Sequence, residues 1–291
     1  MRLALMANEG GEAPESLSGY ISHHLHHLSN HEPKGLVDFS VVHLDTIFFS
    51  LLCATVVLIV LRIAAVRATS GMPGKFQSFV EMIVEWINGE AKTMVHGDTS
   101  YIAPLALLVF CWVTVMNAVD LLPVDWLPSL GEKVAGVPYL RPLPTADLNA
   151  TLGLAFGVLM LVTYYGIKVK GLGGWLHEFA AGHFGSVKLT INPLTWLAGI
   201  LLLAANLFFG LEGFLAPTLS HGFRLYGNMY AGELIFFLIS GLGASATLTG
   251  TILHLLFGTI WAIFHILIVL LQAYVFMMLT LVYIGRAHEH H

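Results

Sequence analysis

The sequence predicts an all-α polytopic membrane protein with five transmembrane helices and one amphipathic helix at the membrane interface, in which the last two membrane helices are long and strongly tilted. Composition and the length of the apolar stretches support this prediction. Hydrophobic residues make up 56% of the chain and charged residues only 11%, against roughly 25% charged residues in soluble domains. Several stretches approach or exceed about 20 apolar residues, the length that spans a bilayer. The net charge of −5 leaves no basic surface for nucleic acid.

Residues 1–42 form a polar, His-rich segment, which we expect to be a solvated extracytoplasmic tail ahead of a membrane domain over residues 43–291. Its first residues have too short an apolar stretch for a secretory signal. Four histidines are clustered in the tail: His23, His24, His26 and His27. No second ligand cluster with fixed spacing lies nearby, so we predict no metal site and no cofactor.

The first three membrane helices are predicted over residues 44–61, 101–122 and 148–167. Each has about 18 to 22 residues, enough to cross roughly 30 Å of hydrocarbon. Each of the first and third is followed by basic residues, which are Arg62, Arg67, Lys168 and Lys170. Such residues mark the place where a chain leaves the bilayer.

Residues 73–95 have a different pattern, with apolar side chains such as Phe76, Phe79 and Ile83 at helical spacing and charged ones on the other side. This pattern predicts a helix that lies flat in the interface. Residues 123–147 hold Pro123, Pro128, Pro138, Pro142 and Pro144. These prolines exclude a continuous helix and predict an ordered outer loop.

The last two apolar segments are too long for upright crossings. Residues 191–240 would extend about 75 Å and residues 251–284 about 50 Å at 1.5 Å per residue. The first must therefore fold back or lie strongly tilted, and two oversized neighbours favour tilt around a partner.

Lys and Arg residues predict the orientation. In a five-span arrangement eight of them share one side: Arg62, Arg67, Lys75, Lys92, Lys168, Lys170, Lys188 and Arg286. Four fall on the other side: Arg2, Lys34, Lys133 and Arg141. The excess places the N-terminus outside, the C-terminus in the cytoplasm and residues 169–190 in a cytoplasmic loop.

Arg224 stands out because it is a permanent charge in an apolar run from about residue 189 to residue 283. Such a charge costs at least about 2.5 to 3.5 kcal/mol at bilayer depth and is a functional hypothesis by default. The run also holds six polar residues typical of a proton path: Glu212, Asn228, Glu233, His254, His265 and Gln272.

Helical geometry groups these residues. Asn228 shares a face with Arg224, whereas Glu233, nine positions on, points the opposite way, so Arg224 and Glu233 are not expected to form an ion pair. In the last helix His254, Trp261, His265, Ile268 and Gln272 form one stripe. We therefore predict that Glu233 and His265 face each other as a proton relay.

Several strings closely resemble subunit a of bacterial F-type ATP synthase, and the resemblance covers nearly the whole chain. The most specific are RLYGNMYAGELI at 224–235 and WAIFHIL at 261–267. Others lie at 20–25, 74–77, 116–123 and 144–149.

The resemblance implies a proton-translocating stator subunit in the bacterial inner membrane, with a rotating c-ring and the subunit b peripheral stalk as partners. Arg224 would face the carboxylate of the ring. The resemblance assigns Glu233, His265, Gln272, Asn117 and Asp120 to an external half-channel. It assigns Glu212 to a cytoplasmic half-channel, and Asn228 lies on the face of Arg224. The chain has no GxxxxGK[ST] phosphate loop, so ATP chemistry would belong to other subunits.

The chain departs from the family pattern between Glu212 and Arg224. This stretch is a couple of residues shorter than usual, and His221 replaces an aliphatic residue. His221 would be either an extra polar group in the cytoplasmic pathway or a tolerated substitution that bonds to the backbone.

The sequence favours this function over two other classes. A secondary transporter would show an internal repeat, and the segment from Arg224 to Glu233 has no second copy. A structural scaffold would not need Arg224. The sequence leaves the choice between protons and sodium open, because ring residues largely set it.

Overall fold

We describe the protein from a computed structural model. The structure describes residues 17–31, 34–35, 38, 40–95, 100–123, 126–136, 140–181, 184–185, 193–244 and 247–288. The chain divides into two compact units. Unit 1 comprises Met1–Met82, Leu108–Thr151 and Leu225–Phe276, and unit 2 comprises Ile83–Leu107, Leu152–Arg224 and Met277–His291.

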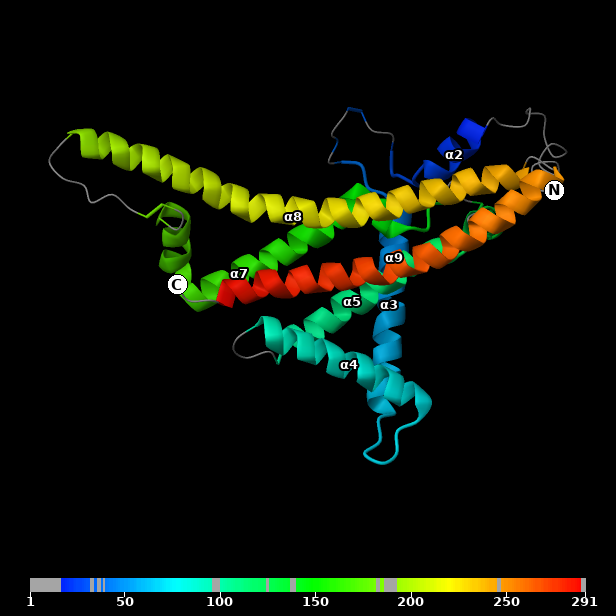
Figure 1. Cartoon of the computed structure of the whole chain (residues 1–291), viewed down its shortest axis with the longest axis horizontal. Helices are drawn as coiled ribbons and strands as arrows, with labels where there is room; N and C mark the ends of the chain where they lie inside the picture. The colour runs from blue at the N-terminus through cyan, green and yellow to red at the C-terminus, as the bar shows by residue number, and fades with distance from the viewer. Residues whose placement is uncertain are drawn as a thin grey trace. The chain divides into compact units, whose positions relative to one another are not determined.

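Five helices of the described residues are long and apolar enough to cross a membrane. They are α3 (Leu44–Val66), α5 (Ile102–Ala118) with its extension η1 (Val119–Leu121), α7 (Leu148–Ala181), α8 (Pro193–Ala244) and α9 (Leu248–His288), all drawn in Figure 1. The only β pairing in these residues is an isolated bridge between Ser29 and His43. The predicted all-α polytopic membrane protein is confirmed.

The amphipathic segment forms α4 (Lys75–Met94), within one or two residues of the predicted bounds. Its charged and polar side chains fall on one side, and Ile87 and Ala91 are its buried residues. This is the pattern that an interfacial helix shows, because only one stripe of such a helix packs against the protein.

In unit 1, α3 packs against the second half of α5. Nε1 of Trp112 donates to the backbone oxygen of Ser50 at 3.0 Å. The short helix α2 (Leu17–Leu25) lies in the predicted tail, and the rings of Tyr20 and His24 lie 6.0 and 5.5 Å from the ring of Phe237. The expectation of a wholly solvated tail is therefore wrong for this part, because its aromatic rings gain apolar contacts. Residues 1–16 lie outside the described residues.

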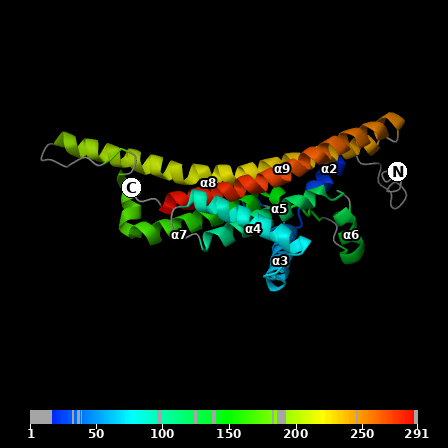
Figure 2. The same cartoon turned by 60° about the horizontal axis from the view of Figure 1, so that its bottom comes forward.

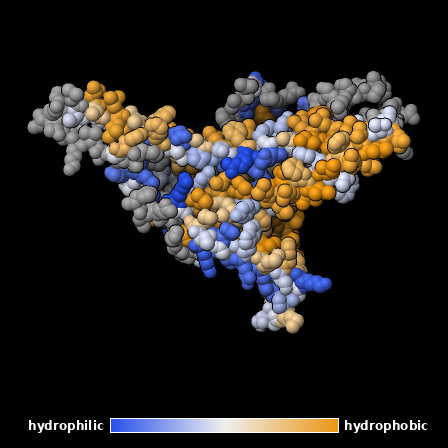
Figure 3. Space-filling view, in the orientation of Figure 1, coloured by the Kyte–Doolittle hydropathy of each residue, from blue (hydrophilic) through white to orange (hydrophobic). Residues whose placement is uncertain are grey.

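Also in unit 1, the C-terminal part of α8 and the N-terminal part of α9 form a hairpin and run side by side (Figures 1 and 2). Nδ1 of His254 lies 2.8 Å from the backbone oxygen of Ile239, which joins the two helices. Hydrophobic surface covers this hairpin (Figure 3), and Ile252, Ile263 and Leu267 are each more than half exposed. Such a surface is typical of contact with lipid or a membrane partner.

α8 is one continuous helix from Pro193 to Ala244, so the predicted alternative of a fold back is wrong. Pro217 lies inside it and removes one backbone donor, without ending the helix. The alternative of strong tilt stays a prediction.

The predicted outer loop contains more helix than its prolines suggested. It holds α6 (Trp126–Ala135), which Figure 2 shows as a short separate helix, and η2 (Pro144–Ala146). Pro128 is the third residue of α6, where a missing backbone N–H costs nothing because the first turn has no acceptor for it. Loop 123–147 is thus not a continuous helix, as expected, but it is partly helical.

In unit 2, α7 runs past the predicted end at residue 167 to Ala181, so the first half of the predicted cytoplasmic loop 169–190 is helical. Gly171 divides α7, with a φ of 72° and a ψ of 160° that glycine adopts without strain. Asn206 of α8 holds the segment that follows α7. Its Oδ1 accepts from the N–H of Phe184 at 2.8 Å, and its Nδ2 donates to Ala180 and Gly185. Residues 186–192 lie outside the described residues.

Candidate functional site

The centre of the site is an ion pair in unit 1 between Arg141, from loop 123–147, and Glu233, from α8. Nε of Arg141 donates to Oε1 of Glu233 at 3.2 Å, and Nη2 donates to Oε2 at 2.5 Å. The two side chains are 5% and 9% exposed. A bidentate pair of this kind fixes both groups, and its loss would leave a buried charge without compensation.

Arg141 stays charged in this environment. Burial disfavours its charged form, but the carboxylate of Glu233 has the larger combined effect and raises the pKa of Arg141 above its usual value. Its backbone N–H donates to Oδ2 of Asp45 at 3.2 Å, which anchors the loop against the start of α3. Arg141 can therefore orient Glu233 but cannot carry protons.

His27, which is partly exposed, contacts both Arg141 and Asp45. Its Nε2 lies 2.9 Å from Nη1 of Arg141, and its Nδ1 lies 3.4 Å from Oδ2 of Asp45. Because an arginine has only donors, Nε2 accepts and the proton of neutral His27 must be on Nδ1. The contact with Arg141 thus fixes the tautomer of the neutral His27 ring.

His265 of α9 is fully buried, and Asp120 of η1 is its acidic neighbour, with Oδ2 2.7 Å from Nε2. The rings of Phe236 and Trp261 flank the imidazole with centroids 5.2 and 5.9 Å away. Gly232 lies so close that a Cβ at this position would overlap Cε1 of His265. The absent side chain at Gly232 is what lets the imidazole lie between α8 and α9.

A small cavity of about 30 Å³ lies between the Arg141–Glu233 pair and the Asp120–His265 pair. One residue of each pair, Glu233 and Asp120, lines it together with His24. This volume exceeds the roughly 10 to 15 Å³ that one water molecule needs. Asn117 is 0% exposed, and its amide atoms make no hydrogen bond with the described residues. The cavity thus has room for a water molecule between Asp120 and Glu233, although most of its other lining residues are apolar.

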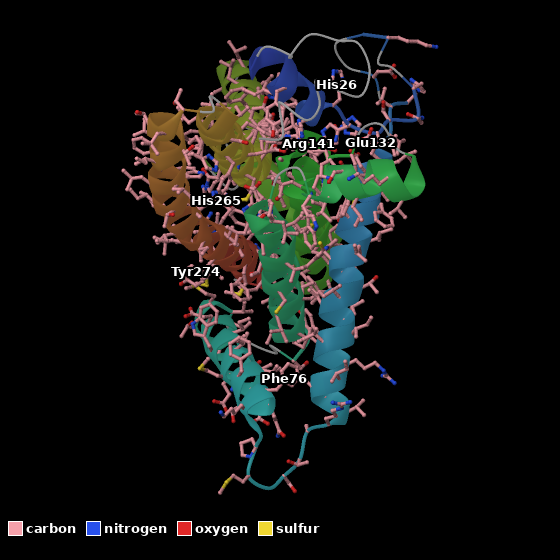
Figure 4. All side chains as sticks on the ribbon, turned by 90° about the vertical axis from the view of Figure 1, so that its right-hand side faces the viewer. His26, Phe76, Glu132, Arg141, His265 and Tyr274 are labelled. Carbon is pink, nitrogen blue, oxygen red and sulfur yellow. The ribbon has the colours of Figure 1, made fainter. Side chains whose placement is uncertain are left out.

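We call these residues of unit 1 the Glu233 cluster: Glu233, Arg141, His27, Asp45, Asn117, Asp120 and His265. Figure 4 shows Arg141 and His265 in it, with His26 of the tail and Glu132 of α6 near the same end. Two further predicted residues are paired beside it in unit 1, because Nδ2 of Asn228 donates to Oε1 of Gln272 at 2.7 Å. The structure thus brings most predicted site residues of unit 1 into polar contacts.

The predicted direct contact between Glu233 and His265 is not among the pairs found in this part of the chain. Each has a different partner, Arg141 for Glu233 and Asp120 for His265. The positive charge that neutralises Glu233 in this unit is that of Arg141.

Unit 2 contains the other predicted site residues. Arg224 is exposed and forms no ion pair with the described carboxylates. A cavity of about 360 Å³ lies in this unit, lined mostly by apolar residues together with six polar ones, Lys170, Glu178, Thr218, His221, Tyr283 and Arg286. Lys170 and Glu178 are paired there at 2.8 Å.

Two residues of this region differ in their placement. Glu212 is exposed and does not line the cavity, whereas His221 is 2% exposed and does. The ring of His221 meets Tyr283 edge to face, with centroids 5.9 Å apart. His221 and Thr218, and not Glu212, are therefore the polar residues of this helix stretch that line the cavity.

Sequence reasoning missed the part of Arg141, His27 and Asp45 in the site. The sequence indicates only a loop charge at Arg141, whereas the structure buries this residue at 4% exposure. The available signal was Asp45, a carboxylate in the first turn of an apolar helix, because such a group requires a partner.

The chain matches the family model described as ATP synthase A chain over residues 47–285. Three relatives named ATP synthase subunit a are similar to it. That of Acidovorax sp. (strain JS42) is 50% identical over 283 residues, with 94% of this chain and 96% of the relative covered. That of Paracidovorax citrulli (strain AAC00-1) is 48% identical over 288 residues, covering 94% and 97%. That of Pseudomonas putida (strain KT2440) is 44% identical over 292 residues, covering 95% and 99%.

Proposed function

This chain belongs to the ATP synthase subunit a family, and from that membership we propose that it is the proton-translocating stator subunit of the enzyme's membrane sector. In this proposal two offset half-channels conduct protons to and from a rotating c-ring, and subunit b of the peripheral stalk holds the chain in place. The location is the bacterial inner membrane, with the N-terminus outside and the C-terminus in the cytoplasm. Nucleotide chemistry takes place in other subunits.

The observation that carries the proposal is the Glu233 cluster, in which Glu233, Asp120 and His265 belong to helices able to span a membrane and have side chains at most 9% exposed. Buried ionisable groups are costly in a membrane protein and mark proton or ion paths. Glu233, Asp120 and His265 can each bind and release a proton, whereas Arg141 supplies a charge that does not change. This combination supports the outer half-channel.

Proton transfer in the outer half-channel would proceed in short steps. A proton entering from outside reaches Asp120 or Glu233 through the 30 Å³ cavity that both line. His265, 2.7 Å from Asp120, exchanges a proton with that carboxylate. Asn228 and Gln272 lie beyond and offer amide groups that orient water. Arg141 holds Glu233 in position throughout.

Arg224 would act on the ring and not on the protein's own acids. An exposed guanidinium on an apolar helix attracts a carboxylate that passes it and makes that carboxylate release its proton. It also keeps protons from passing directly between half-channels, because it cannot accept one. Each proton that crosses supplies about 2.3 kcal/mol per 100 mV of membrane potential.

The test is replacement of Arg224 by Ala in the assembled complex, with proton pumping measured in inverted membrane vesicles. We expect ATP-driven pumping to be abolished and passive proton flow to rise, since the barrier between the half-channels is lost. The control is Arg67→Ala, which removes an exposed arginine just after α3. Coupled pumping that survives Arg224→Ala would refute the proposed role.

A further inference from the structure

Three side chains that commonly bind metal ions meet at the outer edge of the Glu233 cluster in unit 1. They are His27 after α2, His43 before α3 and Asp147 before α7, and their candidate ligand atoms all lie within 4.8 Å of one another. Nδ1 of His43 lies 2.7 Å from Oδ2 of Asp147. The rings of His27 and His43 stack with centroids 4.2 Å apart and planes 4° from parallel.

A second carboxylate completes the group. Oδ2 of Asp45 lies 3.4 Å from Nδ1 of His27, and this nitrogen is buried without a hydrogen bond to the described residues. Thr46 fixes both acids, because its backbone N–H donates to Oδ1 of Asp45 at 2.8 Å and its hydroxyl donates to Oδ2 of Asp147 at 2.9 Å. Anchored carboxylates beside two imidazoles are the usual surroundings of a metal ligand set.

The site is open to solvent on the side of the imidazoles. The side chains of His27 and His43 are 15% and 20% exposed, whereas those of Asp45 and Asp147 are 0% and 4% exposed. An ion can therefore reach the rings from outside while the carboxylates stay in place.

We propose that His27, His43 and Asp147 bind a divalent transition-metal ion of the Zn²⁺ type, with Asp45 as a further oxygen ligand. Two imidazole nitrogens and carboxylate oxygen suit Zn²⁺, Co²⁺ or Ni²⁺, whereas Mg²⁺ and Ca²⁺ prefer oxygen ligands alone. This site goes beyond the proposed function, which needs no metal. The stacked rings have parallel lone pairs, so one ring turns when the ion enters, and His43 is the more exposed of the two.

Metal binding at this site competes with Arg141. Arg141 donates to Nε2 of His27, which keeps the ring's proton on Nδ1. A metal ion on Nδ1 takes that lone pair, and the proton moves to Nε2, where it faces the donor Nη1 of Arg141. The contact between His27 and Arg141 then breaks, and positive charge is added beside the Arg141–Glu233 pair. The ion therefore slows proton entry to Glu233.

The sequence could not reveal this ligand set. His27 belongs to the tail cluster from which we predicted no metal site, and the side chain of His23 in that cluster lies outside the described residues. The other ligands are far away along the chain, with 104 positions between His43 and Asp147. No fixed spacing links such residues, so only the fold brings them together.

The experiment uses the purified, metal-free ATP synthase complex with Co²⁺ as the probe and Zn²⁺ as the competitor. We expect one Co²⁺ with visible absorption typical of nitrogen and oxygen ligands, displaced by Zn²⁺. His43→Asn and Asp147→Asn should each weaken Co²⁺ binding at least about tenfold, the loss expected when one of few ligands is removed. The matched control is His26→Asn, because His26 is exposed and precedes His27. Unchanged binding in both ligand variants, or equal weakening by His26→Asn, would overturn the proposal.

A second variant tests the competition and guards against loss of folding. The double variant Arg141→Gln with Glu233→Gln removes the guanidinium and its charge without leaving a buried unpaired carboxylate, so Co²⁺ should bind more tightly than in the unmodified complex. If His43 and Asp147 had only a structural role, Co²⁺ binding would not tighten in this variant. Co²⁺ binding that does not tighten would therefore contradict the proposed competition with Arg141. Inhibition of proton flow by Zn²⁺, lost in His43→Asn, is a separate measurement. If proton flow is absent throughout but Co²⁺ still binds as expected, the metal site holds and the proposed function fails.

Discussion

Oδ2 of Asp120 lies 2.7 Å from Nε2 of His265, so the acid in contact with this buried imidazole comes from the end of the α5–η1 segment and not from α8. Glu233 is held by Arg141 instead. The proton relay that the sequence placed directly between Glu233 and His265 therefore runs, in our proposal, through Asp120 and the small cavity that it shares with Glu233.

Asp120 and His265 should act as one unit in proton transport. We expect Asp120→Asn and His265→Gln each to lower ATP-driven pumping in inverted vesicles by about tenfold or more, a typical loss when a proton-transfer group is removed. The double variant should be no worse than the worse single one, because both changes break the same step. Glu132→Gln, on an exposed residue of α6, is the control. Losses that multiply would show that the two residues work independently.

Gly232→Ala should disrupt the site although it adds only a methyl group. That methyl group would overlap Cε1 of His265, and overpacking of this kind costs about 1 to 3 kcal/mol. The cost outweighs the gain of about 1 kcal/mol from the better helix propensity of alanine. The thermal stability of the purified complex and proton pumping should both fall. Gly153→Ala is the matched control, since a Cβ there meets nothing within 4 Å, and equal behaviour of the two variants would contradict the prediction.

The Arg141–Glu233 pair should be more costly to break than to replace. Arg141→Gln leaves Glu233 buried and unpaired, which we expect to destabilise the complex by about 3 to 5 kcal/mol. Adding Glu233→Gln removes the unpaired charge and should restore most of the stability, but not proton pumping. Thermal denaturation of the single and double variants measures this difference, with Lys133→Gln on the exposed side of α6 as the control. A double variant less stable than Arg141→Gln would disprove the explanation.

The orientation of the chain can be tested by labelling with an impermeant thiol reagent. The native Cys53 and Cys111 are first replaced by Ala, and single cysteines are then placed at Glu132 or His177, both exposed. We expect the cysteine at Glu132 to be labelled from outside and that at His177 from the cytoplasm, because loops rich in Lys and Arg stay inside. The reverse pattern would invalidate the predicted orientation.

Apolar length was enough to predict the five membrane-capable helices, because no other structure satisfies the backbone of such segments in lipid. The predicted helix boundaries were wrong where the position of a single proline or glycine within a helix decides its effect. Pro128 looked like a helix breaker but lies in the first turn of α6, where proline is tolerated. α7 extends beyond residue 167 because Gly171 lets the chain turn and begin a further helical stretch.

The candidate site was predictable only where single residues stood out. Arg224, Glu233 and His265 are conspicuous as polar groups in apolar segments. Arg141 is an ordinary loop residue in the sequence, and its burial depends on a partner 92 positions away. Periodicity describes one helix at a time, so it cannot find contacts between a loop and a helix distant along the chain.

The charges around Arg141 set the electrostatic potential at the mouth of the site. In this described part of unit 1 one guanidinium stands among four carboxylates, those of Glu233, Asp45, Asp120 and Asp147, and the three neighbouring imidazoles are uncharged unless they bind protons. The mouth of the site therefore has a negative potential, which concentrates cations from the surrounding medium and speeds their arrival. Dissolved salt screens such fields over about 10 Å at 0.1 M ionic strength, so the rate of proton capture from the outer solution should fall as ionic strength rises.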